Sequence, residues 1–158
     1  MMAIEHTTLE VIENHLRGLG AGNHCDNMKR LSRFDSHCSA GLVEKEFFDL
    51  VFLQSDEVVR IAPRGDDRTL RAVAKRAINL GQPRFDANWD LAENLRLMRE
   101  KLRKGSIFQA ALAICETANG EEQYGSWYLQ DGSHRALVCA TLILFMKRNT
   151  SSRQPTAP

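Results

Sequence analysis

The sequence has no apolar run of about 18 residues or more, the length that a membrane-spanning helix needs. Its first residues, MMAIEHTTLEVIENH, include acidic side chains and lack the basic start and apolar stretch of a secretory signal. We therefore expect a cytoplasmic protein that makes no membrane contact.

Cysteine is scarce, with 4 residues in a chain of 158. This is too few for a disulfide scaffold, and a reducing compartment favours free thiols. The sequence places them at Cys25, Cys38, Cys115 and Cys139. Apolar neighbours surround the last two, so we expect both in the core.

A His-Cys pair occurs twice in a polar region, at His24-Cys25 and His37-Cys38. A zinc site is one interpretation of this repeat. Adjacent residues rarely reach the same metal, however, and the sequence has no Cys-x-x-Cys motif. Exposed side chains are the favoured interpretation, and we assign no metal ligand.

The chain also lacks a charge of one sign, because 21 basic and 20 acidic residues leave a net charge of +1. Any contact with nucleic acid therefore needs a local basic patch. The candidates lie on two predicted helices: Arg71, Lys75, Arg76, Lys101, Arg103 and Lys104. Solvated helix faces explain the same residues equally well.

The composition, 43% hydrophobic and 26% charged, is typical of one globular domain with a single core. Residues 1–42 predict an N-terminal helical and loop extension. Thr7 or Thr8 caps a first helix that ends near Leu16, and Gly20–Ala40 is expected to be a loose connection with at most a short turn.

Short apolar segments predict the strands of the following domain. Phe47–Leu53 is apolar and aromatic-rich and favours a buried strand, although a helix over Val43–Leu53 competes with it. Glu57–Ile61 is β-branched and predicts a second extended segment. Phe108–Cys115 and Ser126–Gln130 read as two more strands, joined through an Asn-Gly turn signal.

Three helices are predicted in the same domain. Thr69–Leu80 has apolar residues at helical spacing and Asp66 or Asp67 as its cap. A second helix begins at Asp90 and ends at Gly105. A third, from Ser133 to about Lys147, is apolar on nearly all sides and should be buried. The tail, residues 149–158, is polar and is expected to be disordered.

The junction between the last strand and the last helix carries the best functional signal. Gly132 lets the chain turn sharply and lets a ligand approach the backbone. The amides that begin a helix attract anions, and Arg135 can hold phosphate oxygens in a bidentate fork. His134 can donate a hydrogen bond or move a proton. The alternative interpretation is plain capping of the helix by Asp131 or Ser133.

The stretch YLQDGSHRALVCA resembles the second signature box of the ParB/sulfiredoxin-like superfamily. In that box a strand runs into a Gly-x-His-Arg or Gly-x-Arg-Arg turn at the start of a helix. FDLVFLQSDEVVRIAP, DLAENLRLMREKLRKG and FQAALAIC resemble the family's opening strand, a helix ending in Gly, and the next strand. The resemblance covers about residues 47–147, with residues 64–88 as an insertion.

This resemblance implies an α+β fold, a small mixed sheet packed by helices, over residues 43–148. The superfamily includes partition proteins that bind and hydrolyse CTP, sulfiredoxins that use ATP, free-serine kinases, and proteins reported as nucleases or ATPases. Ser133 stands where sulfiredoxins have a catalytic cysteine, which argues against their thiol chemistry. No helix-turn-helix segment follows the box, so we expect no operator binding.

The expected function is therefore nucleotide binding, of ATP or CTP with Mg²⁺, coupled to phosphoryl or phosphodiester chemistry as an NTPase, kinase or nuclease. The resemblance implies Gly132, Ser133, His134 and Arg135 as phosphate-binding residues, and we assign Asp131 and His134 as catalytic. A non-catalytic regulatory or interaction module with the same nucleotide site is the alternative. The oligomeric state is left open.

Overall fold

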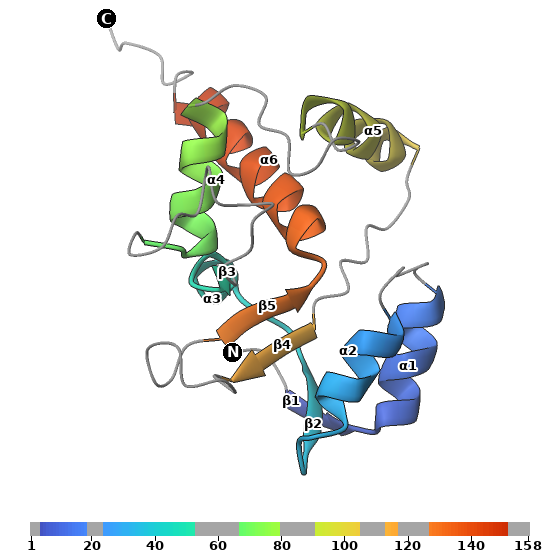
Figure 1. Ribbon diagram of the computed structural model, residues 1–158. Helices are drawn as coiled ribbons and strands as arrows, with labels where there is room; N and C mark the ends of the chain where they lie inside the picture. The colour runs from blue at the N-terminus through green and yellow to red at the C-terminus, as the bar shows by residue number, and fades with distance from the viewer. Residues whose placement is uncertain are drawn as a thin grey trace, which may run out of the picture.

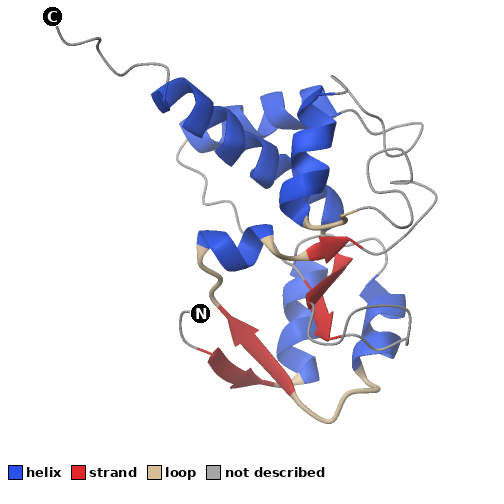
Figure 2. Cartoon of the chain, turned by 90° about the vertical axis from the view of Figure 1, so that its left-hand side faces the viewer, coloured by secondary structure: helices blue, strands red, loops and turns tan. Residues whose placement is uncertain are grey.

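The computed structural model describes residues 4–18, 24–52, 67–79, 91–104, 113–116 and 127–151. These residues form an α+β structure with two small sheets and helices packed beside them (Figures 1 and 2). Within these ranges, none of the helices combines the length and the apolar character required to traverse a bilayer.

The first sheet belongs to an N-terminal β-α-α-β unit. Its elements are β1 (Ile4–Thr7), α1 (Leu9–Gly18), α2 (His24–Leu31) and β2 (His37–Ala40). The two strands pair antiparallel, and α1 packs against α2 (Figure 1). Thr8 is the N-cap of α1, because its Oγ1 accepts a hydrogen bond from Val11 N–H at 3.3 Å. The predicted first helix and one of its two candidate caps are confirmed.

The prediction of a loose connection over Gly20–Ala40 is wrong, since α2 and β2 occupy much of it. α2 has only 8 residues and a strongly polar sequence, and among its described side chains only Leu31 is buried. β2 is stabilised by pairing with β1, whose residues lie 30 to 36 positions earlier in the chain. Such non-local pairing leaves no local pattern in the sequence.

The second sheet contains β3 (Val51–Phe52), β4 (Ala113–Glu116) and β5 (Trp127–Asp131), in the order β3-β5-β4. β5 lies in the centre, parallel to β3 and antiparallel to β4. The outer side of β3 pairs with the chain before α4: Phe52 N–H donates to Arg68 O at 2.9 Å, and Leu70 N–H donates to Leu50 O at 2.6 Å. The sheet is therefore mixed, as predicted.

The strand predicted over Phe47–Leu53 is correct only at its end. Phe47 and Phe48 belong to the short helix α3 (Glu44–Phe48), and β3 follows at Val51. The Glu46 carboxylate accepts a hydrogen bond from Val43 N–H at 3.1 Å and so caps α3. One apolar run thus serves two elements, because Phe48 and Phe52 both enter the core.

Three longer helices complete the described structure: α4 (Leu70–Asn79), α5 (Leu91–Arg103) and α6 (Ser133–Ser151). Both α4 and α5 pack against α6 (Figure 1). The apolar stripe predicted for α4 is confirmed, with Leu70, Val73, Ala74 and Ala77 buried.

The cap of α4 differs from the prediction. Thr69 takes this place, since its Oγ1 accepts from Ala72 N–H at 3.3 Å and its carbonyl accepts from Val73 N–H at 2.9 Å. Asp67 instead accepts the N–H of Thr69 at 2.9 Å. It therefore shapes the turn before the cap, while Asp66 lies outside the described residues.

The first half of α6 is buried as its apolar sequence predicted, from Ala136 to Thr141 except for the half-buried Cys139. The second half is less covered, and Met146 is 63% exposed. Near that end Lys147 forms an ion pair with Glu44 of α3. The helix continues to Ser151, past its predicted end at Lys147 and into the tail predicted to be disordered.

The remaining expectations lie outside the described residues. They are the extended segment Glu57–Ile61, the helix start at Asp90, the Asn-Gly turn at 119–120 and the tail beyond Ser151.

Candidate functional site

The predicted site lies where the central strand passes into the longest described helix (Figure 1). β5 ends at Asp131, and α6 begins at Ser133. Gly132 joins them with a φ of 74°, a left-handed conformation that costs other residues about 1–2 kcal/mol. The predicted need for glycine at this turn is confirmed.

Gly132 is also the N-cap residue of α6. Its carbonyl accepts the first helical hydrogen bond, from Ala136 N–H at 2.8 Å. The amides of Ser133, His134 and Arg135 therefore precede the first i to i−4 hydrogen bond, at the positive end of the helix dipole. A glycine has no side chain that could accept a hydrogen bond from them.

This geometry bears on the alternative interpretation, plain capping. Ser133 is the first residue of α6 and does not occupy the N-cap position. The backbone of Asp131 pairs with Ala113 of β4, and its side chain lies outside the described residues. The capping interpretation is thus wrong for Ser133. Its half-buried side chain, which carries a hydroxyl group, lies in the first turn of α6.

Arg135 and His134 are both half-buried in the first turn of α6. Within the part of the chain that the structure describes, no carboxylate forms an ion pair with Arg135. One turn further on, burial raises the pKa of the Cys139 thiol to about 11, against the opposing effect of the Arg135 charge. Cys139 therefore stays protonated at neutral pH and is not a reactive thiol.

The sequence analysis did not identify a second basic residue near this end of the sheet. Arg68 is only 7% exposed and is one of two polar residues buried in the described part of the chain. It lies opposite Phe52 on the strand that flanks β3, and Phe52 lies beside Leu129 of β5. Side chains at directly paired positions share a face of the sheet.

The face that Arg68 shares with Phe52 and Leu129 is the one on which α6 packs, because both apolar residues join the α6 cluster. Since β3 and β5 are parallel, their carboxyl ends meet at one edge, where α6 begins. A buried guanidinium thus belongs to the same edge and the same face as the candidate site. Its neighbours Asp67 and Thr69 are polar, so no local apolar pattern indicates that Arg68 is buried.

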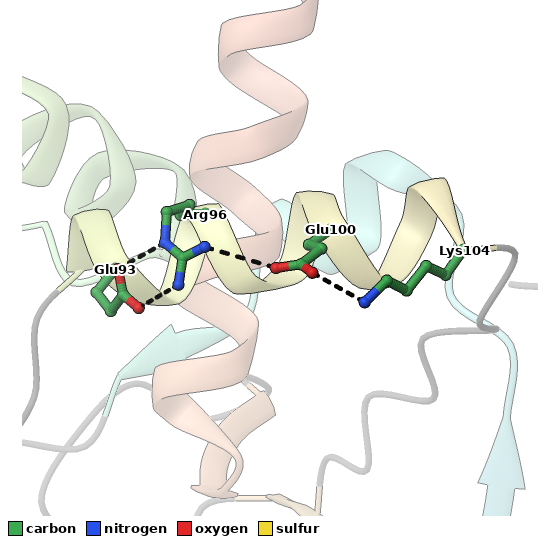
Figure 3. Close-up of polar contacts among 4 residues, drawn as sticks. All are labelled: Glu93, Arg96, Glu100 and Lys104. Carbon is green, nitrogen blue, oxygen red and sulfur yellow. Dashed lines mark hydrogen bonds and ion pairs between the residues drawn. The ribbon is translucent and has the colours of Figure 1, made fainter.

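Three of the six residues in the basic patch predicted on two helices make contacts inside the protein. Arg71 lies over the Phe48 ring at 4.3 Å, and Arg76 donates to Asp67 O. Lys104 forms an ion pair with Glu100 at 2.8 Å (Figure 3). Lys75 and Arg103 are exposed, and the side chain of Lys101 is outside the described residues. The favoured interpretation, ordinary helix faces, fits these contacts better than a nucleic-acid interface does.

The His-Cys pairs do not converge either. Nε2 of His37 lies 2.8 Å from Leu31 O at the end of α2, while Cys25 and Cys38 are exposed. Among the residues described, no three His, Cys, Asp or Glu side chains form a group that could hold a metal.

Comparison with protein-family models, with curated proteins and with solved structures gives no match to this chain. The interpretation of the site therefore rests on the β5–Gly132–α6 junction itself.

Proposed function

We propose that this protein binds a nucleoside triphosphate, ATP or CTP, at the N-terminus of α6 within a ParB/sulfiredoxin-like domain. The observation that carries the proposal is the glycine N-cap. Gly132 has a positive φ, and its carbonyl accepts a hydrogen bond from Ala136 N–H. Because glycine has no side chain, Gly132 cannot cap the helix with one. The amides that begin a helix attract phosphate groups.

The residues of the first turn divide the binding between them. The amides of Ser133 and His134 face the anion with the helix dipole behind them. Arg135 supplies a guanidinium that no described carboxylate neutralises and that can grip two phosphate oxygens. In this arrangement Arg68 adds buried positive charge on the same face of the sheet.

Phosphoryl or phosphodiester chemistry at such a site depends on positioning and on stabilising charge in the transition state. His134 is proposed to donate a hydrogen bond to a phosphate oxygen or to move a proton, and Asp131 to accept a proton from an attacking hydroxyl. Mg²⁺ accompanies the triphosphate, and the oxygen ligands that it prefers come from the phosphates together with a carboxylate such as Asp131.

The direct test is calorimetric titration of the full chain with ATP and with CTP in the presence of Mg²⁺. Arg135→Ala should weaken binding by about ten- to a hundredfold, the equivalent of charge-assisted hydrogen bonds worth about 1.5–3 kcal/mol. Arg148→Ala is the matched control, because Arg148 is an exposed arginine at the other end of the same helix. Lack of binding by either nucleotide, or equal affinity in Arg135→Ala, contradicts the proposal.

Turnover then separates an enzyme from a non-catalytic nucleotide-binding module. If the protein is an enzyme, the rate of phosphate release by the full chain should fall in His134→Ala. The rate should be unchanged in His15→Ala, which removes an exposed histidine on α1. Nucleotide binding without any product from the unaltered protein supports the module. A nuclease is indicated only by Mg²⁺-dependent DNA cleavage that Asp131→Ala abolishes.

A further inference from the structure

The β1–β2 sheet brings together two metal-binding side chains that lie far apart in the sequence. In its register, His6 of β1 lies directly opposite Cys38 of β2. Directly opposed residues point to the same face of an antiparallel pair, with Cβ atoms about 4.5–5.5 Å apart. Both side chains are exposed, and Cys38 forms no disulfide within the described residues.

This face of the sheet is turned away from α2. The neighbouring pair, Thr7 and His37, occupies the other face, where the half-buried His37 ring contacts Leu31 O at the end of α2. Both helices of the unit lie to one side of the two strands in Figures 1 and 2. Ala40, which shares a face with Cys38, is also exposed. A small ion in solution can therefore reach His6 and Cys38 together.

We propose that His6 and Cys38 bind one soft monovalent cation, Cu⁺ in a cell, through the imidazole nitrogen and the thiolate sulfur. Metal–sulfur and metal–nitrogen bonds of about 2.3 and 2.0 Å separate the two donor atoms by about 4 Å when they are collinear. Opposed side chains on paired strands can span that distance.

The number and type of ligands favour this class of ion. Zinc in a structural site needs four ligands, and the described residues offer no group of three around this pair. Thiolate is a soft ligand that selects Cu⁺, and this d¹⁰ ion accepts two-coordinate geometry. On binding, the Cys38 thiol releases its proton to water as the sulfur–metal bond forms, and the oxidation state of the metal does not change. This site is independent of the one at α6.

The test is an anaerobic Cu⁺ titration of the full chain against a chromogenic Cu⁺ chelator. Cys25→Ser serves as the parent, because Cys25 is the second cysteine that is exposed among the described residues. The parent should hold one Cu⁺ per chain, and binding should perturb the NMR signals of the His6 ring. In this parent, Cys38→Ser should abolish the tight binding.

His6→Ala should weaken Cu⁺ binding by about tenfold or more, because a second ligand on the same surface acts at high effective concentration. His15→Ala is the matched control on an exposed helix and should have no effect. His6→Cys should restore the affinity. The proposal is overturned if His6→Ala binds Cu⁺ as tightly as the parent, if Cys38→Ser keeps the site, or if Zn²⁺ competes equally well.

Discussion

The N-terminal β-α-α-β unit and the structure around α6 both combine a small sheet with helices, yet they bury side chains to very different extents. Around α6, apolar side chains from α3, β3, α4, α5 and β5 converge on one cluster. In the N-terminal unit the described buried side chains are Leu16 and Leu31. The two regions therefore depend on different interactions.

A pair of strands with little apolar cover is only marginally stable by itself. The N-terminal unit relies more on strand pairing and on local contacts such as that between His37 and Leu31 O. We expect local opening to occur there at lower free energy than around α6. The proposed phosphate site thus lies in the region that buries more side chains, and the proposed metal site in the region that buries fewer.

The largest expected effect comes from replacing a buried leucine by alanine in each of the two regions. Leu137→Ala should lower the free energy of unfolding by about 3–5 kcal/mol, because Leu137 is fully buried in the core cluster and its removal leaves a cavity. Leu31→Ala should cost about 2–3 kcal/mol, since a thinner region can collapse around the cavity. Urea unfolding followed by circular dichroism measures both. Equal losses would show that the two regions are equally packed.

The same difference explains how far the sequence predicts the fold. α4 was predictable because its apolar residues repeat at helical spacing and all four enter the core. The β5–Gly132–α6 junction was also predictable, since glycine between an apolar strand and an apolar helix is a local signal. Of the candidate site, the turn and its glycine are thus visible in the sequence.

Features that depend on distant partners were not predictable. β2 depends on β1, and the buried position of Arg68 depends on pairing with β3. The aromatic residues Phe47 and Phe48 predict a strand, because aromatic side chains pack well on pleated sheets. The cap by Glu46 and the burial of Phe48 favour the helix that is observed. In each case tertiary contacts decide the conformation over local preference.

The next effect in size tests the turn at the start of α6. Gly132→Ala forces a side chain into a φ of 74° and should cost about 1–2 kcal/mol of stability. It should also weaken nucleotide binding if the amides of the first turn shift. Thermal unfolding with and without ATP measures both effects, and full stability in Gly132→Ala would contradict the strained turn.

Two matched N-caps compare the regions more finely. Thr69 caps α4 and Thr8 caps α1, each through Oγ1 at 3.3 Å from a backbone nitrogen. Thr69→Ala should lower global stability by about 1 kcal/mol. Thr8→Ala should instead act mainly on local opening, seen as faster amide hydrogen exchange in α1. If both variants shift the global unfolding midpoint equally, the N-terminal unit unfolds together with the rest of the protein.

The acid side of the stability profile should respond to Asp67. The hydrogen bond from Thr69 N–H holds the pKa of this carboxyl below its ordinary value, with a smaller contribution from the Arg76 charge. A lowered pKa in the folded state contributes stability above the unfolded pKa, about 3.9, and this contribution disappears as pH falls through the folded value. Asp67→Asn should therefore reduce stability more at pH 6 than at pH 2.5. Denaturant midpoints at the two pH values measure this difference, and an equal loss at both would assign Asp67 a purely packing role.

The smallest effect is expected on the surface of α5, where Glu93, Arg96, Glu100 and Lys104 form a chain of ion pairs (Figure 3). Glu100 lies between two cations, with Arg96 at 3.5 Å and Lys104 at 2.8 Å. Glu100→Gln removes both exposed pairs and should cost about 0.3–1 kcal/mol. The loss should become smaller in about 1 M salt, which shortens the Debye length to about 3 Å.

Glu13→Gln on α1 is the matched variant in the N-terminal unit, because Glu13 pairs with Arg17 at 2.5 Å on an exposed helix face. It removes one pair instead of two and should lower the unfolding free energy by about 0.3–0.5 kcal/mol, again only at low salt. Denaturant titrations at low and high ionic strength compare the two variants. If Glu13→Gln lowers the unfolding free energy more than Glu100→Gln does, surface ion pairs stabilise the N-terminal unit more than its few buried side chains do. The two regions then differ in the kind of interaction that stabilises them and not in how stable they are.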